Sequence, residues 1–222
     1  MKGPILNLLR ELRFRTPLRR FSPSFHAYDY MFSPAQLAFL VSCLDDTRKV
    51  DGPIVEVGCA LGKTTVYLDR HLTDVGDERR YLCVDTFSGF VPDDVEFEAS
   101  KRNKTRSLLD GFSVNQKSWF DLNLADNHIT RVSTFESDIK RFDLSSHAPR
   151  ISFCLLDVDL YQPIKVGLEK IVPLLGKGGI VVVDDVKPNN TFDGAYQAYV
   201  EYVETHQLPE EIVHGKLGVI RG

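Results

Sequence analysis

From residue 53 onward, short aliphatic runs rich in β-branched residues alternate with helix-forming segments, and this alternation is the strongest constraint on the fold. The expected strands span residues 53–58, 81–85, 129–132, 151–157, 180–184, 211–214 and 217–221. The expected helices between them span residues 63–72, 164–175 and 195–206. Alternating strands and helices form a parallel sheet with helices on both faces. The sequence therefore predicts an α/β fold with a doubly wound, mostly parallel seven-stranded sheet.

The length of 222 residues suits one such domain with added segments. We expect an N-terminal arm and helix over residues 1–48 and the sheet domain over residues 49–222. Ser33 and Pro34 mark the start of that helix, as its N-cap and first helical residue. The polar stretch at about 91–128 is expected to be an inserted helical or mobile segment, because long structureless loops are uncommon in compact domains.

The first twenty residues are basic and carry leucines at helical spacing, including Leu8 and Leu12. Two interpretations stay open: a helix on a membrane surface, or an arm that packs on its own domain or on a partner subunit. The second interpretation makes a homo-oligomer reasonable. Because the sequence lacks 18 consecutive apolar residues and a signal-peptide pattern, we expect a cytoplasmic protein without stable membrane insertion.

Composition argues against one class of partner. The formal net charge is -4, whereas nucleic-acid binding favours a strongly basic face, so we expect no nucleic-acid partner. The four cysteines form no CxxC pair and lie in apolar segments, which is typical of buried, reduced thiols.

The first strand leads into a turn of small residues, Gly58, Ala60 and Gly62, that allows close approach of a ligand to the backbone. The turn lacks both the GxGxxG dinucleotide pattern and the first glycine of a phosphate loop, which disfavours a phosphate cradle. Glu56, just before the turn, would repel a pyrophosphate but is suited to pair with the ammonium group of a methionine moiety. These features favour S-adenosylmethionine over a dinucleotide.

Asp85 ends the second strand, just over 20 residues beyond the turn, where an acidic residue accepts hydrogen bonds from ribose hydroxyls. The alternative is an ordinary carboxylate at a strand end or helix cap. The segment 133–138 is expected to follow the third strand and to lie beside the adenine. Phe135 is suited to stack on the base, although an aromatic residue here is as often part of the core.

Further carboxylates follow later strands: Asp157 after one strand, and Asp184 and Asp185 after another. If these strands are neighbours, the three carboxylates converge and require a cation or protons to offset their repulsion. Oxygen ligands suit a hard cation such as Mg²⁺, Ca²⁺ or Mn²⁺. The alternative is that Asp184 and Asp185 cap the following helix. Asp159 is a plausible general base or a residue that stabilises a turn.

Four sequence blocks give the chain a family resemblance: Glu56-x-Gly58, residues 85–90 (DTFSGF), residues 156–161 (LDVDLY) and residues 178–185 (GGIVVVDD). Together they resemble the macrocin O-methyltransferase (TylF-like) family, over roughly residues 50–221. The resemblance implies a Rossmann-like class I methyltransferase fold and methylation of sugar hydroxyls of macrolide and aminocoumarin natural products. It also implies Mg²⁺ dependence, with Asp157, Asp184 and Asp185 as metal ligands and Asp159 as the candidate base.

The sequence thus predicts an S-adenosylmethionine-dependent O-methyltransferase acting on a small-molecule hydroxyl. The expected cofactor-binding residues are Glu56, Gly58, Ala60, Gly62, Thr64, Asp85, Ser88, Thr134, Phe135 and Asp157. Three alternatives stay open: a metal-independent methyltransferase on oxygen or nitrogen, a nicotinamide-dependent oxidoreductase, and a non-catalytic module. The basic residues at 101–106 are either an anion-recognition element or a solvated face. Tyr28, Tyr30 and Met31 are either lining of the acceptor pocket or core.

Overall fold

The computed structural model describes residues 8, 9, 12, 30–106 and 115–222. The chain divides into two units, Met1–Met31 and Phe32–Gly222, and the fold described below is that of the second. The arginines of the basic arm and Tyr28 lie outside the described residues. No helix among the described residues is long and apolar enough to cross a membrane.

The second unit is built on one seven-stranded sheet with the order β3-β2-β1-β4-β5-β7-β6. The strands are β1 (Ile54–Val57), β2 (Tyr81–Asp85), β3 (Val132–Glu136), β4 (Ile151–Leu156), β5 (Leu175–Val183), β6 (Ile212–Val213) and β7 (Leu217–Arg221). The first five pair in parallel, and β7 pairs antiparallel with both β5 and β6. Every residue of β1 and β4 is buried, as expected for central parallel strands. The predicted fold class is confirmed.

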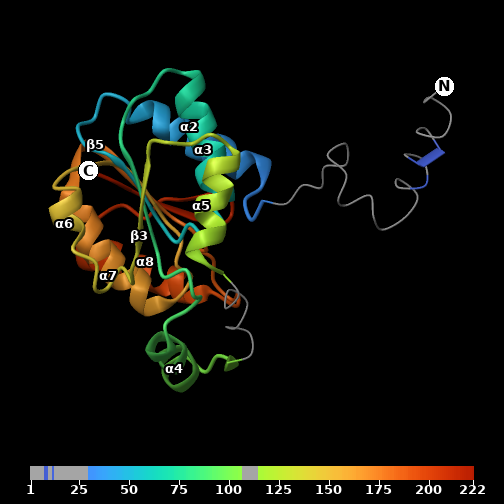
Figure 1. Cartoon of the computed structure of the whole chain (residues 1–222). Coiled ribbons are helices and arrows are strands. Elements are labelled where there is room, and N and C mark those ends of the chain that lie inside the picture. Colours follow the sequence, from blue (N-terminus) through green and yellow to red (C-terminus); the bar gives the residue numbers. More distant parts are fainter. Residues whose placement is uncertain (1–7, 10–11, 13–29, 107–114) are drawn as a thin grey trace, which may run out of the picture. The chain divides into compact units, whose positions relative to one another are not determined.

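Helices cover both faces of this sheet (Figure 1). The helices of this unit are α2 (Pro34–Asp46), α3 (Lys63–Asp74), α4 (Pro92–Lys101), α5 (Lys117–Asp126), α6 (Leu144–His147), α7 (Tyr161–Ile171) and α8 (Asp193–Thr205). The predicted start of the first of these is confirmed: Ser33 and Gln36 form a reciprocal capping box, and Pro34 is the first helical residue. A short 3₁₀ turn, Val172–Leu174, follows α7 and leads into β5.

Two predicted strands were placed wrongly, while the others match the structure to within one residue at each end. The third strand runs Val132–Glu136 rather than 129–132. The residues before it bond to helices instead: the Ile129 amide donates to the Leu124 carbonyl oxygen of α5, and Arg131 donates to Thr73 of α3. The fifth strand begins at Leu175 rather than at residue 180, so Gly176, Gly178 and Gly179 lie inside it. The pairing of β4 with β5 is irregular between Ile151 and Phe153, and the glycines lie in this irregular part of β5. A Cβ atom at Gly179 would lie about 3.0 Å from backbone oxygens of β4.

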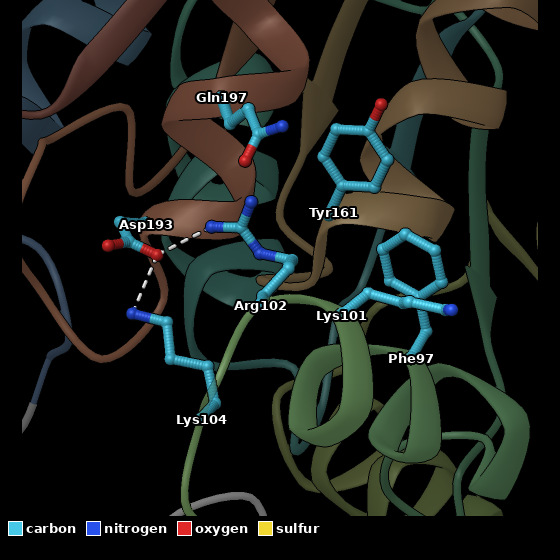
Figure 2. Close-up of a pocket in the computed structure, with 7 residues that line it drawn as sticks. All are labelled: Phe97, Lys101, Arg102, Lys104, Tyr161, Asp193 and Gln197. Atoms are coloured by element: carbon cyan, nitrogen blue, oxygen red, sulfur yellow. Dashed lines mark hydrogen bonds and ion pairs between the residues drawn. The ribbon is translucent and has the colours of Figure 1, made fainter.

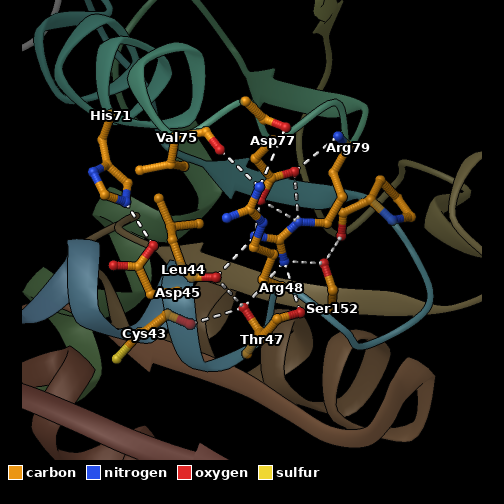
Figure 3. A network of polar contacts seen from close by, with 12 residues as sticks. Cys43, Leu44, Asp45, Thr47, Arg48, His71, Val75, Asp77, Arg79 and Ser152 are labelled. Carbon is orange, nitrogen blue, oxygen red and sulfur yellow. Dashed lines mark hydrogen bonds and ion pairs between the residues drawn. The ribbon is translucent and has the colours of Figure 1, made fainter.

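A polar network holds the amino-terminal ends of the strands together (Figure 3). The Arg79 guanidinium donates to the carbonyl oxygens of Leu44 and Thr47, at the end of α2, and to Ser152 Oγ in β4. It also forms an ion pair of 2.7 Å with Asp77, whose side chain is 4% exposed. Arg79 therefore satisfies orphan carbonyls of a helix terminus and joins three elements at this edge.

Candidate active site

The register of the four central strands aligns the predicted site residues at the carboxyl ends of these strands, opposite the Arg79 network. Val57 pairs with Val84 and with Leu156, and Leu156 pairs with Val183. The residues that follow these positions are therefore neighbours in space: Gly58, Asp85, Asp157 and Asp184. The strand order reverses between β1 and β4, and ligands of open α/β sheets bind at such a switch point. The predicted convergence of these residues at one edge is confirmed.

The turn after β1 touches the segment after β4. Gly58 has a φ of +85°, and a Cβ there would lie 1.7 Å from the carbonyl oxygen of Asp157. Only glycine combines this conformation with such a close approach. Gly62, with a φ of +78°, lies beneath the ring of Phe120 from α5. The glycine turn is thus held against the acidic segment on one side and against α5 on the other.

Asp85 at the end of β2 reaches the same turn. Its Oδ2 accepts a hydrogen bond of 2.8 Å from the Ala60 amide, and its Oδ1 accepts one of 2.7 Å from the Phe87 amide. Burial raises the pKa of Asp85, while the amides of Phe87 and Ala60 oppose that rise. Of the other expected cofactor residues, Ser88 is exposed just beyond Asp85, and Thr64 is half-buried in the first turn of α3.

Glu56 lies within the sheet rather than at its edge. Its carboxylate is 1% exposed, and Oε2 accepts hydrogen bonds from Tyr81 (2.6 Å) and Thr65 (2.7 Å). Burial raises its pKa to about 7, although both hydroxyls favour the charged form. In this structure Glu56 braces β1 against β2 and α3, so direct pairing with a ligand ammonium group stays a prediction.

Thr134 and Phe135 belong to β3 and not to the segment after it. They pair with Cys83 and Val84 in the sheet. The ring of Phe135 packs at 5.1 Å from Phe142 and 4.5 Å from His147, measured between centroids. Phe135 thus packs against the core, and the segment expected to follow the third strand is largely part of it. The expected contact of Thr134 and Phe135 with the adenine stays a prediction.

Four carboxyl groups gather beyond β4 and β5: Asp157, Asp159, Asp184 and Asp185. Burial raises the pKa of Asp157, with Asp184 adding to the rise. Burial likewise raises the pKa of Asp159, with Asp185 adding to the rise through charge and a hydrogen bond. Asp184 has a pKa raised by burial to about 6. These shifts are those of acids that repel one another in a site with little water.

The backbone at two of these acids is left-handed. Asp159 has a φ of +59° and Asp185 a φ of +56°. Aspartate tolerates this region better than most residues, but non-glycine residues rarely adopt it, and such conformations cluster at functional sites. Each aspartate turns the chain sharply just after a central strand, which keeps both carboxyl groups beside the sheet edge.

Lys216 is the site residue that the sequence analysis missed. Its Nζ lies 2.6 Å from Asp184 Oδ2 and 3.3 Å from Asp185 Oδ1. Burial opposes its positive charge, but Asp184 and Asp185 outweigh that effect and raise its pKa. The signal was the antiparallel pairing of β7: because Gly218 pairs with Val183, the residue before β7 falls beside the acids that follow β5.

The acids have the chemistry of a hard-cation site but not its arrangement. Among the described residues, His, Cys, Asp and Glu form no group of three or more placed to hold a metal ion. Asp184 Oδ1 is buried without a hydrogen-bond partner, so one oxygen ligand is available. The other oxygen of Asp184 is already bound to Lys216.

The basic residues at 101–106 are mostly paired within the chain. Arg102 forms ion pairs with Glu98 and Asp193 at 2.8 and 2.7 Å, and Lys104 binds Asp193 at 2.7 Å. They border a cavity of about 310 Å³ between α4, α7 and α8 (Figure 2). The cavity is lined by Phe97, Lys101, Arg102, Lys104, Tyr161, Asp193 and Gln197. Three acids thus neutralise much of this basic segment, counting Glu96 beside Arg106.

Comparisons with known proteins agree with this geometry. The family model described as Macrocin-O-methyltransferase (TylF) matches residues 22–217. The O-methyltransferase NovP is similar in structure, with a TM-score of 0.74 and 18% identity over 86% of this chain and 81% of that one. CalS11, a calicheamicin methyltransferase, has a TM-score of 0.66 and 19% identity over 100% of this chain and 86% of that one. A second structure, of apo CalS11, has a TM-score of 0.61 and 24% identity over 97% and 91%.

At these identities the solved structures support the fold, and no curated protein sequence matches the chain. The family match covers almost the whole chain and includes the turn after β1, Asp85 and the acids after β4 and β5. The chain therefore belongs to the macrocin O-methyltransferase (TylF) family and is an S-adenosylmethionine-dependent O-methyltransferase.

Proposed function

We propose that this enzyme methylates a hydroxyl group of a sugar in natural-product biosynthesis. The observation that carries the proposal is the contact between Gly58 and Asp157, which joins the glycine turn to a cluster of four carboxyl groups. A donor on the turn and an acceptor beside the acids would be neighbours. The neighbour CalS11 is described as a TDP-rhamnose 3'-O-methyltransferase, which supports a sugar as the acceptor class.

The donor side of the site consists of the turn and the end of β2. We assign the backbone at Gly58, Ala60 and Gly62 to contact the methionine part of S-adenosylmethionine, because small residues admit close approach. Each oxygen of the Asp85 carboxylate accepts one hydrogen bond from a backbone amide and can accept another, and these remaining positions bind the ribose hydroxyls. Thr64, Ser88 and Asp157 complete this side, and Glu56 supports it from within the sheet.

The acceptor side consists of the acids after β4 and β5. The oxygen donors of Asp157, Asp184 and Asp185 have the chemistry that Mg²⁺ or another hard divalent cation prefers, and the unpartnered Asp184 Oδ1 is a free ligand for it. Because the described acids are not arranged as a metal site, binding would require their side chains to move together. The chemistry that such an ion supplies is polarisation of the acceptor hydroxyl and control of its orientation.

Asp159 is the candidate general base. It accepts the hydroxyl proton as the acceptor oxygen attacks the methyl carbon of the sulfonium group. A C–O bond forms while the C–S bond breaks, and S-adenosylhomocysteine leaves as the neutral thioether. Alignment of the oxygen, carbon and sulfur atoms by the two sides of the site contributes several kcal/mol to the rate.

Calorimetric titration tests the donor site. The full chain is expected to bind S-adenosylhomocysteine and not NAD or NADP, and Asp85→Asn should weaken binding at least tenfold. Asp143→Asn is the control, since Asp143 is an exposed N-cap of α6 and asparagine caps equally well. Binding of NAD instead of S-adenosylhomocysteine would favour the oxidoreductase alternative and overturn the proposal.

Methyl transfer to a panel of hydroxylated sugars tests the acceptor site. Asp159→Asn is expected to lower kcat by a factor of about 10²–10⁴ without changing S-adenosylhomocysteine binding. Asparagine suits the left-handed backbone there, so the fold should be retained. Full activity after EDTA treatment and in Asp184→Asn would instead identify a metal-independent methyltransferase.

A further inference from the structure

Lys216 occupies the position that a cation would take between two of the acids. Its ammonium group bonds to Asp184 Oδ2 and lies within ion-pair distance of Asp185 Oδ1. The Lys216 side chain is 19% exposed and that of Asp184 is 4% exposed, so little water screens the pair.

The backbone fixes this lysine in place. The Lys216 carbonyl oxygen accepts a hydrogen bond of 2.7 Å from the amide of Val186, the residue after the two acids. Its own amide donates to Val213 in β6, and its Nζ lies 4.9 Å from the centre of the Phe32 ring. The antiparallel arrangement of β7 therefore determines that an ammonium group faces Asp184.

The oxygens that bind Lys216 are among those that a divalent cation needs. A cation on Asp184 and Asp185 would share the site with a positive charge a few ångströms away, at an energetic cost, unless Nζ moves out. Asp184 Oδ1 remains available, so Lys216 restricts the site without removing all of its ligands.

We propose that Lys216 is a resident counter-ion that competes with the divalent cation for Asp184 and Asp185. Lys216 consequently offsets the repulsion among the acids when no metal is bound. The metal binds weakly, and its binding releases Lys216 from Asp184. This inference rests on the proposed function, because it takes the same carboxylates as metal ligands.

Metal binding by the lysine variant tests this competition. Titration of the full chain with Mn²⁺, followed by electron paramagnetic resonance of free Mn²⁺, should show at least tenfold tighter binding by Lys216→Met than by the wild type. Lys187→Met is the matched control: it removes an exposed lysine near the acids and should change the Kd by less than twofold. Equal or weaker Mn²⁺ binding by Lys216→Met would overturn the inference.

The wild-type chain supplies a test that does not depend on folding of a variant. Acetylation of lysines by acetic anhydride, read by mass spectrometry, should be faster at Lys216 in saturating Mn²⁺ than without it, and unchanged at Lys187. An unchanged rate at Lys216 despite bound Mn²⁺ contradicts the competition.

A parallel titration with S-adenosylhomocysteine separates the two proposals. If the wild type and Lys216→Met both bind S-adenosylhomocysteine and neither binds Mn²⁺, the inference about Lys216 fails while the proposed methyl transfer is unaffected. If neither protein binds it, the proposed function itself fails.

Discussion

Buried carboxyl groups in this chain have two kinds of partner. Glu56 is surrounded by neutral donors, the hydroxyls of Tyr81 and Thr65 and the thiol of Cys83. Asp184 has the ammonium group of Lys216. Burial outweighs the partner at both groups: it raises the pKa of Glu56 to about 7 against the neutral donors, and that of Asp184 to about 6 against Lys216.

The stability of the protein should therefore depend on pH through Glu56. Between about pH 4.5 and 7 the unfolded chain releases this proton while the folded chain retains it, so the free energy of unfolding falls as pH rises. Glu56→Gln removes this dependence. Between pH 5 and pH 8 the free energy of unfolding of the variant, relative to that of the wild type, should rise by up to about 3 kcal/mol. Urea denaturation across this range measures the difference.

Glu136→Gln is the control for that experiment, because Glu136 is an exposed carboxylate at the end of β3 in the same sheet. Its stability relative to the wild type should stay constant with pH. A Glu56→Gln curve parallel to that of the wild type would show that Glu56 is already ionised in the folded protein at pH 5.

At the scale of elements, the turns on either side of α3 each contain a glycine with a positive φ, Gly58 before the helix and Gly76 after it. Gly58 needs both a positive φ and the space that a Cβ would fill, 1.7 Å from the Asp157 carbonyl oxygen. Gly76, after α3, also has a positive φ of +65°, but nothing lies within 4 Å of its Cβ position. The two positions separate backbone strain from steric overlap.

Gly58→Ala is expected to destabilise the fold far more than Gly76→Ala. The strain of a left-handed alanine costs about 1–2 kcal/mol and applies to both variants. Only Gly58→Ala must also push β1 away from the segment after β4. Thermal unfolding should show a small decrease in Tm for Gly76→Ala and a much larger decrease, or failure to fold, for Gly58→Ala. Equal decreases would mean that the contact with Asp157 relaxes easily.

The sequence was sufficient to predict most elements but not all contacts between them. Strands such as β4 and the carboxylates after them follow from apolar runs that end in acids. The start of β3 could not be predicted, because Arg131 is anchored by Asp77 and Thr73, which are distant in sequence. Lys216 was missed for a related reason, since its place beside Asp184 depends on the direction of β7.

At the scale of the whole sheet, residues at one end of the strands stabilise the fold, and residues at the other end form the candidate site. The Arg79 network lies at the amino-terminal ends of the strands, and the acids lie at the carboxyl ends. Burial opposes ionisation of Asp77, but its bonds with Arg79 outweigh this and lower its pKa. That stabilisation is present above the unfolded pKa of an aspartate and is lost as pH falls below it.

Arg79→Met should lower the free energy of unfolding by about 3–5 kcal/mol, because it leaves Asp77 charged and buried without its partner. Binding of S-adenosylhomocysteine should change less than twofold at temperatures where the variant is folded. The control is Arg150→Met, which removes an exposed pair of 3.8 Å with Asp51 and should change stability by less than about 1 kcal/mol. Loss of ligand binding in folded Arg79→Met would contradict the separation of the two edges.

The position of β7 between β5 and β6 has a consequence for folding of the chain during its synthesis on the ribosome. The ribosome makes all five parallel strands, with Asp157, Asp184 and Asp185, before it makes Lys216 and β7. A nascent chain at that stage has an open edge on β5 and uncompensated negative charge beside it. When β7 pairs with β5, it covers this edge and brings the Lys216 ammonium group to Asp184, so the candidate site is completed only after translation has passed residue 221.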